Sequence, residues 1–443
     1  MIFSYPTHGA VVHDFWRFMN NIAIIGLGYV GLPLSLQFAR SGASVLGLDI
    51  DSKKTDAICA GQSYIKHVAA EEIVAQRAAG RLDASTDFSR IGEVEAVILC
   101  VPTPLSHFRE PDLSYVLNTG KAIAPFLKKG TLVVLESTTY PGTTDGELRS
   151  VLENGSGLTA GVDFHLAFSP EREDPGNPDS KVAAIPKVVG GLTPDCLEKA
   201  IALYSRAIQK LVPVSSCRVA EASKLLENIF RSVNIALVNE LKVVYGAMDI
   251  DIWEVIEAAK TKPFGFMPFY PGPGLGGHCI PIDPFYLTWK AREFGQHTRF
   301  IELAGEINTA MPDHVVKVAF EALNQEGKSV NGSRVLLLGL AYKANVDDDR
   351  ESPTYKLIEK FESLGANVAY HDPHVPVIPM TREHAEYAGR KSVAAITPDY
   401  DLIVLATGHD DYKSFDFAAY TIPLVDTRNA VPPKNRPKAY YKA

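Results

Sequence analysis

One glycine-rich turn constrains the fold of this chain more than any other feature. The apolar run NIAII at 21–25 leads into GLGYVG, and the apolar-periodic stretch LPLSLQFARSG follows. In this G-x-G-x-x-G pattern Gly26 allows a tight turn, Gly28 lets the backbone approach a pyrophosphate, and Gly31 permits close helix–strand packing. The start of the helix offers free N–H groups and the positive end of its dipole to phosphates. We predict a dinucleotide-binding strand–turn–helix to which two intervening residues also contribute: Tyr29 and Val30.

An acid at the end of the next apolar run indicates which dinucleotide binds. The segment SVLGLDID predicts a second strand, and Asp49 closes it 18 residues after Gly31. An acid there accepts hydrogen bonds from ribose hydroxyls and repels a 2′-phosphate, so we expect NAD rather than NADP. Lys54 could touch a phosphate or be solvated, and it is included in the predicted cofactor site. A glycine turn alone could equally be a helix-packing turn beside a surface aspartate; the strand, helix and acid together favour NAD.

Length and composition exclude several classes of protein. The chain has 443 residues, of which 46% are hydrophobic and 22% charged, as in a soluble globular protein of two or three domains. Its net charge of −8 gives no reason to expect nucleic acid or an anionic membrane as partner. No apolar run approaches the roughly 20 residues of a membrane-spanning helix.

The termini and the cysteines point to a cytoplasmic protein. Residues 1–20 lack the basic start and apolar core of a secretion signal and are predicted to be an extension, with Met19 as an alternative start. The five cysteines show no CxxC or metal-like spacing. We therefore expect reduced thiols, a cytoplasmic location and no metal site.

Alternating strand-like and helical segments predict a first parallel-sheet domain. Apolar runs at 96–102 and 131–138 flank a helical stretch at 115–126. Two further runs, at 164–168 and 186–190, are expected to complete the domain. Buried apolar strands that alternate with helices are typical of a parallel sheet covered on both faces.

The rest of the chain predicts a helical region and a second sheet. A helix from about 218 to 246 carries apolar residues at three-to-four spacing, and it would span on the order of 40 Å, enough to connect domains and offer a dimer surface. A Gly/Pro-rich loop at 266–281 interrupts the helices that follow. After Gly332, RVLLLGLAY, NVAYHDP, DLIVLAT and PLVDTR again predict strands of an α/β domain.

The predicted fold is therefore α/β, with two Rossmann-like parallel-sheet domains joined by a long central helix and a helical middle domain. The expected divisions are an N-terminal extension (1–20), an NAD-binding domain (21–212), a helical, dimer-forming central domain with a cysteine loop (213–325) and a C-terminal α/β domain (326–443).

One cysteine has a setting that differs from the others. Cys279 lies in the flexible sequence GPGLGGHCIPIDP, with Asp283 four residues later, whereas Cys59 and Cys100 have the settings of structural thiols. A single loop cysteine is more often a packing group than a nucleophile, so this feature alone leaves both roles open.

Seven motifs occur in order from about residue 21 to the C-terminus: GLGYVGLPLS, CVPTP, ESTTYPGT, SPERED, EASKLLEN, GLGGHCIPIDP and YKANVDDDRESP. With these motifs, nearly the whole chain resembles the UDP-glucose/GDP-mannose dehydrogenase family. Within that family it is most similar to the UDP-N-acetyl-D-glucosamine 6-dehydrogenase branch, which supplies uronic acids for bacterial surface polysaccharides such as O-antigen.

The resemblance implies a two-step oxidation of an alcohol to a carboxylate. Cys279 matches the nucleophile that captures the intermediate aldehyde as a thiohemiacetal, which a second hydride loss converts to a thioester. Lys224 and Asn228, one turn apart on the long helix, match the groups that stabilise and hydrogen-bond the reacting oxygen. Asp283 matches the acid that helps to deprotonate the alcohol, and Glu171 the base for thioester hydrolysis.

The same resemblance assigns the remaining contacts. Thr138 matches the residue that positions the hydrolytic water, and it also belongs to the expected NAD site. Other matches to NAD contacts are Val101, Pro102, Thr103, Pro104, Ser137 and Arg350. Matches to substrate contacts, besides Lys224, Asn228 and Glu171, are Arg172, Tyr270, Pro271, Gly272, Gly274, Gly276, Gly277, Lys343 and Arg428. Lys343 and Arg428 would hold the UDP end, because cations suit a diphosphate.

Individually, these charged and polar residues could be ordinary surface or turn residues. Only their joint occurrence in the order of the family's motifs favours catalytic roles. UDP-glucose enzymes usually have a small residue directly before the nucleophile, whereas this chain has His278 there. Together with KPFGF at 262–266, His278 favours an N-acetylhexosamine as the sugar of the substrate. The epimer is left open among UDP-N-acetylglucosamine, UDP-N-acetylmannosamine and UDP-N-acetylgalactosamine, with UDP-glucose as a further alternative.

Two other hypotheses are a hydroxyacid dehydrogenase without a covalent step and a non-catalytic nucleotide-sugar or NAD sensor. A homodimer or higher homo-oligomer is expected.

Overall fold

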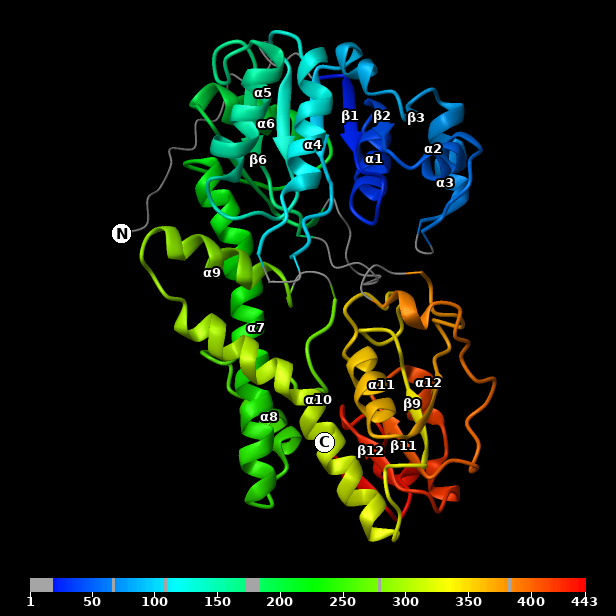
Figure 1. Ribbon diagram of the computed structural model, residues 1–443. Coiled ribbons are helices and arrows are strands. Elements are labelled where there is room, and N and C mark those ends of the chain that lie inside the picture. The colour runs from blue at the N-terminus through cyan, green and yellow to red at the C-terminus, as the bar shows by residue number, and fades with distance from the viewer. Residues whose placement is uncertain (1–18, 66–67, 107–109, 173–183, 278–279, 381–383) are drawn as a thin grey trace. The chain divides into compact units, whose positions relative to one another are not determined.

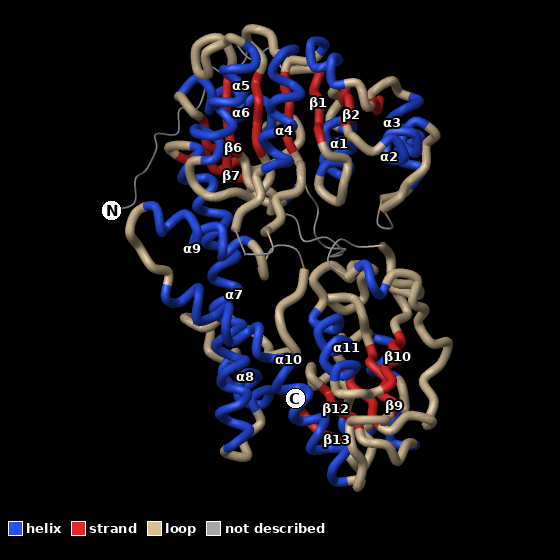
Figure 2. Tube along the Cα trace, viewed as in Figure 1, coloured by secondary structure: helices blue, strands red, loops and turns tan. Residues whose placement is uncertain are grey.

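The computed structural model describes residues 19–65, 68–106, 110–172, 184–277, 280–380 and 384–443. They form two compact units, one within 19–104 and 112–224 and the other within 105–111 and 225–443 (Figures 1 and 2). Within these described ranges, no helix is both long and apolar enough to cross a membrane.

The first unit is built on an eight-stranded sheet with the order β3–β2–β1–β4–β5–β6–β7–β8. Its strands are β1 (Asn21–Ile25), β2 (Ser44–Leu48), β3 (Leu82–Ser85), β4 (Ala96–Leu99), β5 (Leu132–Leu135), β6 (His165–Phe168), β7 (Lys187–Gly191) and β8 (Leu211–Val214). Neighbouring strands are parallel except for β6 and β7, which pair antiparallel.

Helices cover both faces of this sheet. They are α1 (Gly31–Arg40), α2 (Ser52–Cys59), α3 (Ala70–Ala78), α4 (Ser114–Ile123), α5 (Arg149–Ser156) and α6 (Pro194–Tyr204). Along β1, Ile22 and Ile24 enter one apolar core while Ala23 and Ile25 enter the other, because alternate residues of a strand face opposite sides. Helices α1, α2, α3 and α6 contribute to the first core, and α4 and α5 contribute to the second. This double burial explains why β1 is apolar throughout, and Figure 2 shows the strands between layers of helices.

The second unit begins with a helical region. Helix α7 (Cys217–Ala247) starts in the first unit and continues into the second, and α8 (Ile252–Ala259), α9 (Asp283–Glu293) and α10 (Arg299–Gln325) follow. Val238 of α7 packs against Trp253 and Ile256 of α8. The predicted long helix is therefore present, with ends within one residue of the expected ones.

A five-stranded parallel sheet completes the second unit, in the order β10–β9–β11–β12–β13. Its strands are β9 (Arg334–Leu338), β10 (Asn367–His371), β11 (Leu402–Leu405), β12 (Leu424–Asp426) and β13 (Tyr440–Lys442), with helices α11 (Pro353–Ser363) and α12 (Asp410–Ser414). Val315 and Ala319 of α10 share an apolar core with Leu357 of α11. The predicted fold class, two Rossmann-like sheets with a helical middle region, is confirmed.

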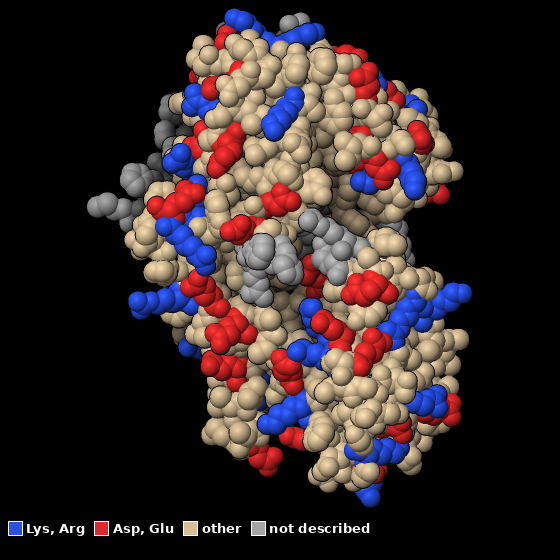
Figure 3. Space-filling model, in the orientation of Figure 1, with Lys and Arg blue, Asp and Glu red and all other residues tan. Residues whose placement is uncertain are grey.

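Charge is distributed without a dominant sign on the face of the molecule shown in Figure 3, where basic and acidic side chains are interspersed. The whole chain carries a net charge of −8. Recognition of an anionic ligand must therefore come from a few local cations rather than from the overall field.

Candidate active site

The glycine turn between β1 and α1 has the geometry of a phosphate cradle. Gly26 has a φ of +91°, and a Cβ there would lie 2.4 Å from the carbonyl oxygen of Cys100. A Cβ on Gly31 would lie 1.8 Å from the carbonyl oxygen of Gly26. A Cβ on Gly28, in contrast, would meet nothing within 4 Å. The turn is thus closed by Gly26 and Gly31 and open at Gly28, which fits a pyrophosphate that approaches the backbone there.

Asp49 fixes this turn from the end of β2. Its carboxylate is buried and accepts hydrogen bonds from the N–H of Leu27 at 2.8 Å and of Asp51 at 3.0 Å. Lys54 Nζ lies 3.0 Å from the same carboxylate, so in this structure Lys54 contacts the acid. Tyr64, which was not anticipated, donates its hydroxyl hydrogen bond to the carbonyl of Leu27 at 2.6 Å.

The loops after β4 and β5 are tied together beside the turn. Ser137 Oγ accepts a hydrogen bond from Val101 N–H at 3.0 Å and donates one to the Val101 carbonyl at 2.7 Å. Thr138 follows as a half-buried residue, and Pro102, Thr103 and Pro104 continue the other loop. Because β1 and β4 are neighbours at the centre of the sheet, these loops flank the position where doubly wound sheets bind dinucleotides. The residues present therefore fit NAD.

Two predicted catalytic residues meet at the end of the first unit. Lys224 of α7 is buried, and its ammonium group donates to the backbone carbonyl of Glu171. The side chain of Arg172 is held by the carbonyl of Pro186, with 2.6 Å between Nη1 and the oxygen. A small cavity is lined by Glu171, Arg172 and Lys187 among other residues.

Two more predicted catalytic residues, Asn228 and Asp283, contact each other in the second unit. Asn228, also on α7, donates its side-chain amide to Asp283, with 2.5 Å between Nδ2 and Oδ2. Both side chains are buried. Asp283 begins helix α9, where the positive end of the helix dipole favours a negative charge. Since Lys224 and Asn228 are four residues apart in one continuous helix, they point to the same side of α7.

The predicted nucleophile Cys279 and the neighbouring His278 lie outside the described residues. The chain just before them is held by the second sheet's loops. Gly277, with a φ of +80°, donates its N–H to the carbonyl of Arg350 at 3.1 Å. A Cβ on Gly276 or Gly277 would come within 2.9 Å of the Tyr342 side chain. These glycines therefore permit close packing on Tyr342, and Arg350 anchors the loop through its backbone while its guanidinium pairs with Asp348.

The predicted substrate loop reaches Arg428. The guanidinium of Arg428 packs directly on Gly272, where a Cβ would lie 2.2 Å from Nη1, and its Nε donates to the Ala406 carbonyl at 3.1 Å. Pro271 and Gly274 of the same loop are also buried, whereas Tyr270 is exposed and donates its hydroxyl to Glu257 at 2.7 Å. The structure thus brings Gly272 and Arg428 together and directs Tyr270 toward α8.

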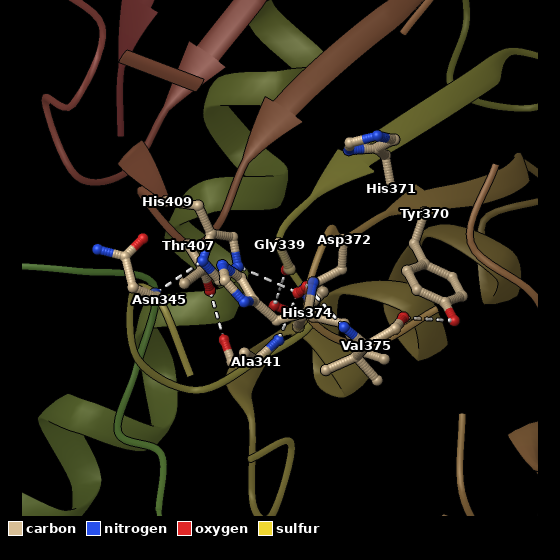
Figure 4. Close-up of polar contacts among 12 residues, drawn as sticks. Gly339, Ala341, Asn345, Tyr370, His371, Asp372, His374, Val375, Thr407 and His409 are labelled. Atoms are coloured by element: carbon tan, nitrogen blue, oxygen red, sulfur yellow. Dashed lines mark hydrogen bonds and ion pairs between the residues drawn. The ribbon is translucent and has the colours of Figure 1, made fainter. Parts of the chain in front are cut away.

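Lys343 lies in a loop fixed by a buried polar network that sequence reasoning missed. Figure 4 shows His409 between Asn345 and Asp372: the ring accepts from Asn345 N–H at 2.9 Å and lies 3.1 Å from the carboxylate. Thr407 donates to the carbonyl of Ala341 at 2.6 Å. The loop that carries Lys343 is therefore held on both sides, at Ala341 and at Asn345.

The Asp372 network repeats the geometry around Asp49. Asp372 follows β10, as Asp49 follows β2, and it accepts from the N–H groups of Leu340 and Ala341 at 2.6 and 2.9 Å. Burial raises the pKa of Asp372, but hydrogen bonds from His409 and the backbone outweigh it and lower the value to about 2. Because Ala341 and His409 close this second turn, the open glycine turn of the first sheet is the better dinucleotide site. The common signal was an aspartate directly after the second strand of each sheet.

A buried ion pair lies near Glu171, and the sequence did not predict it. Lys187 Nζ is 3.0 Å from Glu136 Oε2, and the Tyr204 hydroxyl donates to the other carboxylate oxygen. Burial raises the pKa of Glu136, and Lys187 opposes that effect. Glu136 directly precedes Ser137 in the ESTTYPG motif, but nothing in the sequence distinguishes this buried acid from a surface acid.

Comparison with known proteins accounts for almost the whole chain. Residues 20–208 match the NAD binding domain of the UDP-glucose/GDP-mannose dehydrogenase family, 218–310 its central domain and 336–433 its UDP binding domain. The UDP-N-acetyl-D-glucosamine 6-dehydrogenase of Pseudomonas aeruginosa is 37% identical over 395 residues, covering 89% of this chain and 91% of that protein. The NDP-N-acetyl-D-galactosaminuronic acid dehydrogenase of Ralstonia solanacearum is 34% identical over 406 residues, covering 90% and 92%. The solved structure of the UDP-D-ManNAc dehydrogenase from Pyrococcus horikoshii matches with a TM-score of 0.86 and 32% identity, covering 95% of this chain and 98% of that one.

Proposed function

The chain belongs to the UDP-glucose/GDP-mannose dehydrogenase family and is an NAD-dependent nucleotide-sugar dehydrogenase, and we propose that it oxidises the C6 hydroxyl of UDP-N-acetyl-D-glucosamine to a carboxylate. The observation that carries the proposal is the buried Asn228–Asp283 pair on the same side of α7 as Lys224. These groups suit the handling of an alcohol proton and of the charge that develops on its oxygen.

The overall reaction consumes water and two molecules of cofactor. One UDP-sugar, two NAD and one water give the UDP-uronate, two NADH and three protons. NAD, when bound at the glycine turn, accepts the hydrides that leave C6. The protein must orient C6, manage protons and keep the aldehyde from escaping between the two oxidations.

In the first oxidation, we assign the alcohol proton to Asp283, either directly or through a water molecule. Asn228 donates to Asp283, and this leaves the amide oxygen of Asn228 able to accept from the substrate hydroxyl. Lys224, already next to the Glu171 backbone, would stabilise the oxygen as negative charge develops on it.

The second oxidation requires a covalent step, which we assign to Cys279 from the sequence. The thiolate forms a C–S bond with C6 of the aldehyde, and the oxygen takes up a proton to give a thiohemiacetal. Loss of the second hydride and of that proton leaves a thioester. Water then attacks C6, Glu171 accepts its proton with Thr138 positioning the water, and the C–S bond breaks to release the thiolate and the carboxylate.

The UDP end is assigned to Lys343 and Arg428, in the part of the chain that matches the family's UDP binding domain. A guanidinium forms paired hydrogen bonds with phosphate oxygens, and an ammonium group adds a point charge. The GGHC and KPFGF segments support an N-acetylhexosamine rather than glucose. The choice of the gluco epimer rests on the resemblance of the ordered motifs to the UDP-N-acetylglucosamine branch, since relatives named for three different N-acetylated sugars match this chain with 34–37% identity.

The test measures NADH formed per molecule of limiting UDP-sugar, together with kcat/KM, for UDP-N-acetylglucosamine, its manno and galacto epimers, and UDP-glucose. We expect two NADH and the highest kcat/KM for UDP-N-acetylglucosamine. Two NADH with a different preferred sugar would move the substrate assignment and retain the chemistry. One NADH would refute the covalent mechanism, and binding without any NADH would indicate a sensor.

We further propose that the enzyme acts as a homodimer in the cytoplasm. The support for self-association is an exposed apolar stripe on α7, formed by Leu226, Phe230, Leu237 and Val244. At 100° per residue, these four side chains fall within about 40° of each other around the helix axis. A second copy that covers this stripe would bury a continuous apolar surface.

A further inference from the structure

A buried lysine on α7 stands out because it has no counter-charge. Lys242 is 5% exposed, and its ammonium group is 3.4 Å from the carbonyl oxygen of Gly272. Among the described residues, its ammonium group forms no ion pair with a carboxylate. A long hydrogen bond to one carbonyl is poor compensation for removing an ammonium ion from water.

A second cation contacts the same loop residue. The guanidinium of Arg428 also packs on Gly272, and its Nε donates to the neutral carbonyl of Ala406. Gly272 thus contacts both Lys242 and Arg428, with its carbonyl directed to the lysine. A side chain at position 272 would displace the guanidinium.

The surrounding groups do not compensate fully for the burial of these two cations, because the pKa of each is lowered. Burial first, and then the charge of Arg428, lower the pKa of Lys242 to about 7. His314 on α10 also faces Lys242, and burial together with Lys242 and Lys317 lowers its pKa to about 4. Burial lowers the pKa of Arg428 to about 10, and the charge of Asp426 opposes this effect only in part. The Asp426 oxygens accept hydrogen bonds from the Arg428 and Val431 N–H groups and from Tyr440.

We propose that Lys242 is a further anion-binding residue of the nucleotide-sugar site, which acts with Arg428 across Gly272 to bind the diphosphate. The bound diphosphate supplies the negative charge that these two cations lack. This inference rests on the proposed function, because that proposal places the UDP end at Arg428. A diphosphate matches two neighbouring cations of this kind, because the guanidinium of Arg428 can form paired hydrogen bonds with phosphate oxygens and the ammonium group of Lys242 adds a compact positive charge.

A purely structural role for Lys242 makes a different prediction. If its only task were to hold the Gly272 carbonyl, a neutral donor such as glutamine would replace it. If its charge is what matters, both Lys242→Gln and Lys242→Met weaken binding. Because methionine removes a buried, unpaired charge, Lys242→Met should also leave the ligand-free protein as stable as wild type or more stable.

The experiment is calorimetric titration of the full-length protein with UDP and with uridine. The variants are Lys242→Met and Lys242→Gln, with Lys317→Met as a control that removes an exposed lysine of α10. Both Lys242 variants should bind UDP about ten- to a hundredfold more weakly, the value of one lost charge-assisted hydrogen bond. Their affinity for uridine, and both affinities of Lys317→Met, should stay at wild-type values.

A second measurement counts the protons that the protein takes up when it binds UDP. Since the diphosphate favours the charged form of Lys242, wild-type protein at pH 8 should take up protons when it binds UDP. The uptake is measured from the dependence of the binding enthalpy on buffer ionisation enthalpy, and Lys242→Met should reduce it. Wild-type UDP affinity in Lys242→Gln, or undiminished uptake in Lys242→Met, overturns the inference while the proposed function stands. Failure of the wild-type protein to bind UDP overturns both.

Discussion

Two alanine substitutions in the glycine turn should separate cofactor binding from folding. Gly28→Ala places a methyl group where no atom beyond the adjacent residues lies within 4 Å, and Gly28 does not have a positive φ. Gly31→Ala places a Cβ 1.8 Å from the carbonyl oxygen of Gly26. We therefore expect Gly28→Ala to fold normally and to lose NAD affinity, and Gly31→Ala to lose stability.

The magnitudes follow from these contacts. An added methyl group at Gly28 would prevent the pyrophosphate from accepting one or two hydrogen bonds from backbone N–H groups. Each such hydrogen bond to a charged acceptor contributes about 1.5–3 kcal/mol to binding, so NAD should bind at least about tenfold more weakly. The stability of Gly28→Ala should change by less than about 1 kcal/mol. Overlap with a backbone atom at Gly31 should cost at least about 2–3 kcal/mol, or a fall of about 4–12 °C in Tm for a unit of this size.

The assay combines thermal unfolding with titration of NAD for both variants and wild type. We expect opposite results for the two variants: an unchanged Tm with weak NAD binding for Gly28→Ala, and a lowered Tm for Gly31→Ala. Wild-type NAD affinity in Gly28→Ala would refute the assignment of this turn to the pyrophosphate. A Gly31→Ala protein as stable as wild type would refute the packing argument.

Three further substitutions test other parts of the account. Lys187→Met should destabilise the first unit by about 3–5 kcal/mol in chemical denaturation, because it leaves Glu136 buried without its partner, whereas replacing both residues with apolar ones should recover much of the loss. Leu237→Glu should convert the expected dimer to a monomer in light scattering, while Val243→Glu, which is exposed on another side of α7, should leave the dimer intact; a dimeric Leu237→Glu protein would contradict the proposed interface. Asp372 has a lowered pKa of about 2, so its contribution of about 2 kcal/mol is present above pH 4 and is lost as the pH falls toward 2. The stability deficit of Asp372→Asn in urea should therefore shrink across that range, and a deficit independent of pH would contradict the assigned role.

Local patterns predicted the elements that depend on local physics. The strand at 21–25 coincides with β1, because a continuous apolar run bounded by glycine is typical of a buried parallel strand. The long helix was predicted almost to the residue, since α7 keeps its apolar spacing over 31 residues. The antiparallel pairing of β7 with β6 was not predicted, because an apolar run does not encode strand direction.

The candidate site shows a similar division. The motifs drew attention to Lys224, Asn228 and Asp283, but the contact between Asn228 and Asp283 joins residues 55 positions apart and depends on tertiary folding. Lys242 was missed because a lysine in an amphipathic helix ordinarily marks the solvated face. Only the packing of Gly272 and Arg428 beside it reveals a buried cation.

The network around Asp372 was missed for another reason. The sequence GLAYK lacks the glycine pattern, so the motif alone does not indicate a counterpart of Asp49 in the second sheet. The shared elements are a glycine with positive φ, at Gly26 and Gly339, and an aspartate after the next strand of the sheet. This pair of features, without the full glycine pattern, is enough to indicate Asp372.

The central claim is that one cysteine carries the substrate between two oxidations, and it is tested most directly by the NADH yield of Cys279→Ser. With limiting UDP-N-acetylglucosamine, wild-type enzyme and the control Cys59→Ser, which alters an exposed cysteine, should each form two NADH per sugar. Cys279→Ser should form no more than one, because no thioester can be made. Two NADH per sugar from Cys279→Ser at a wild-type rate would contradict the account.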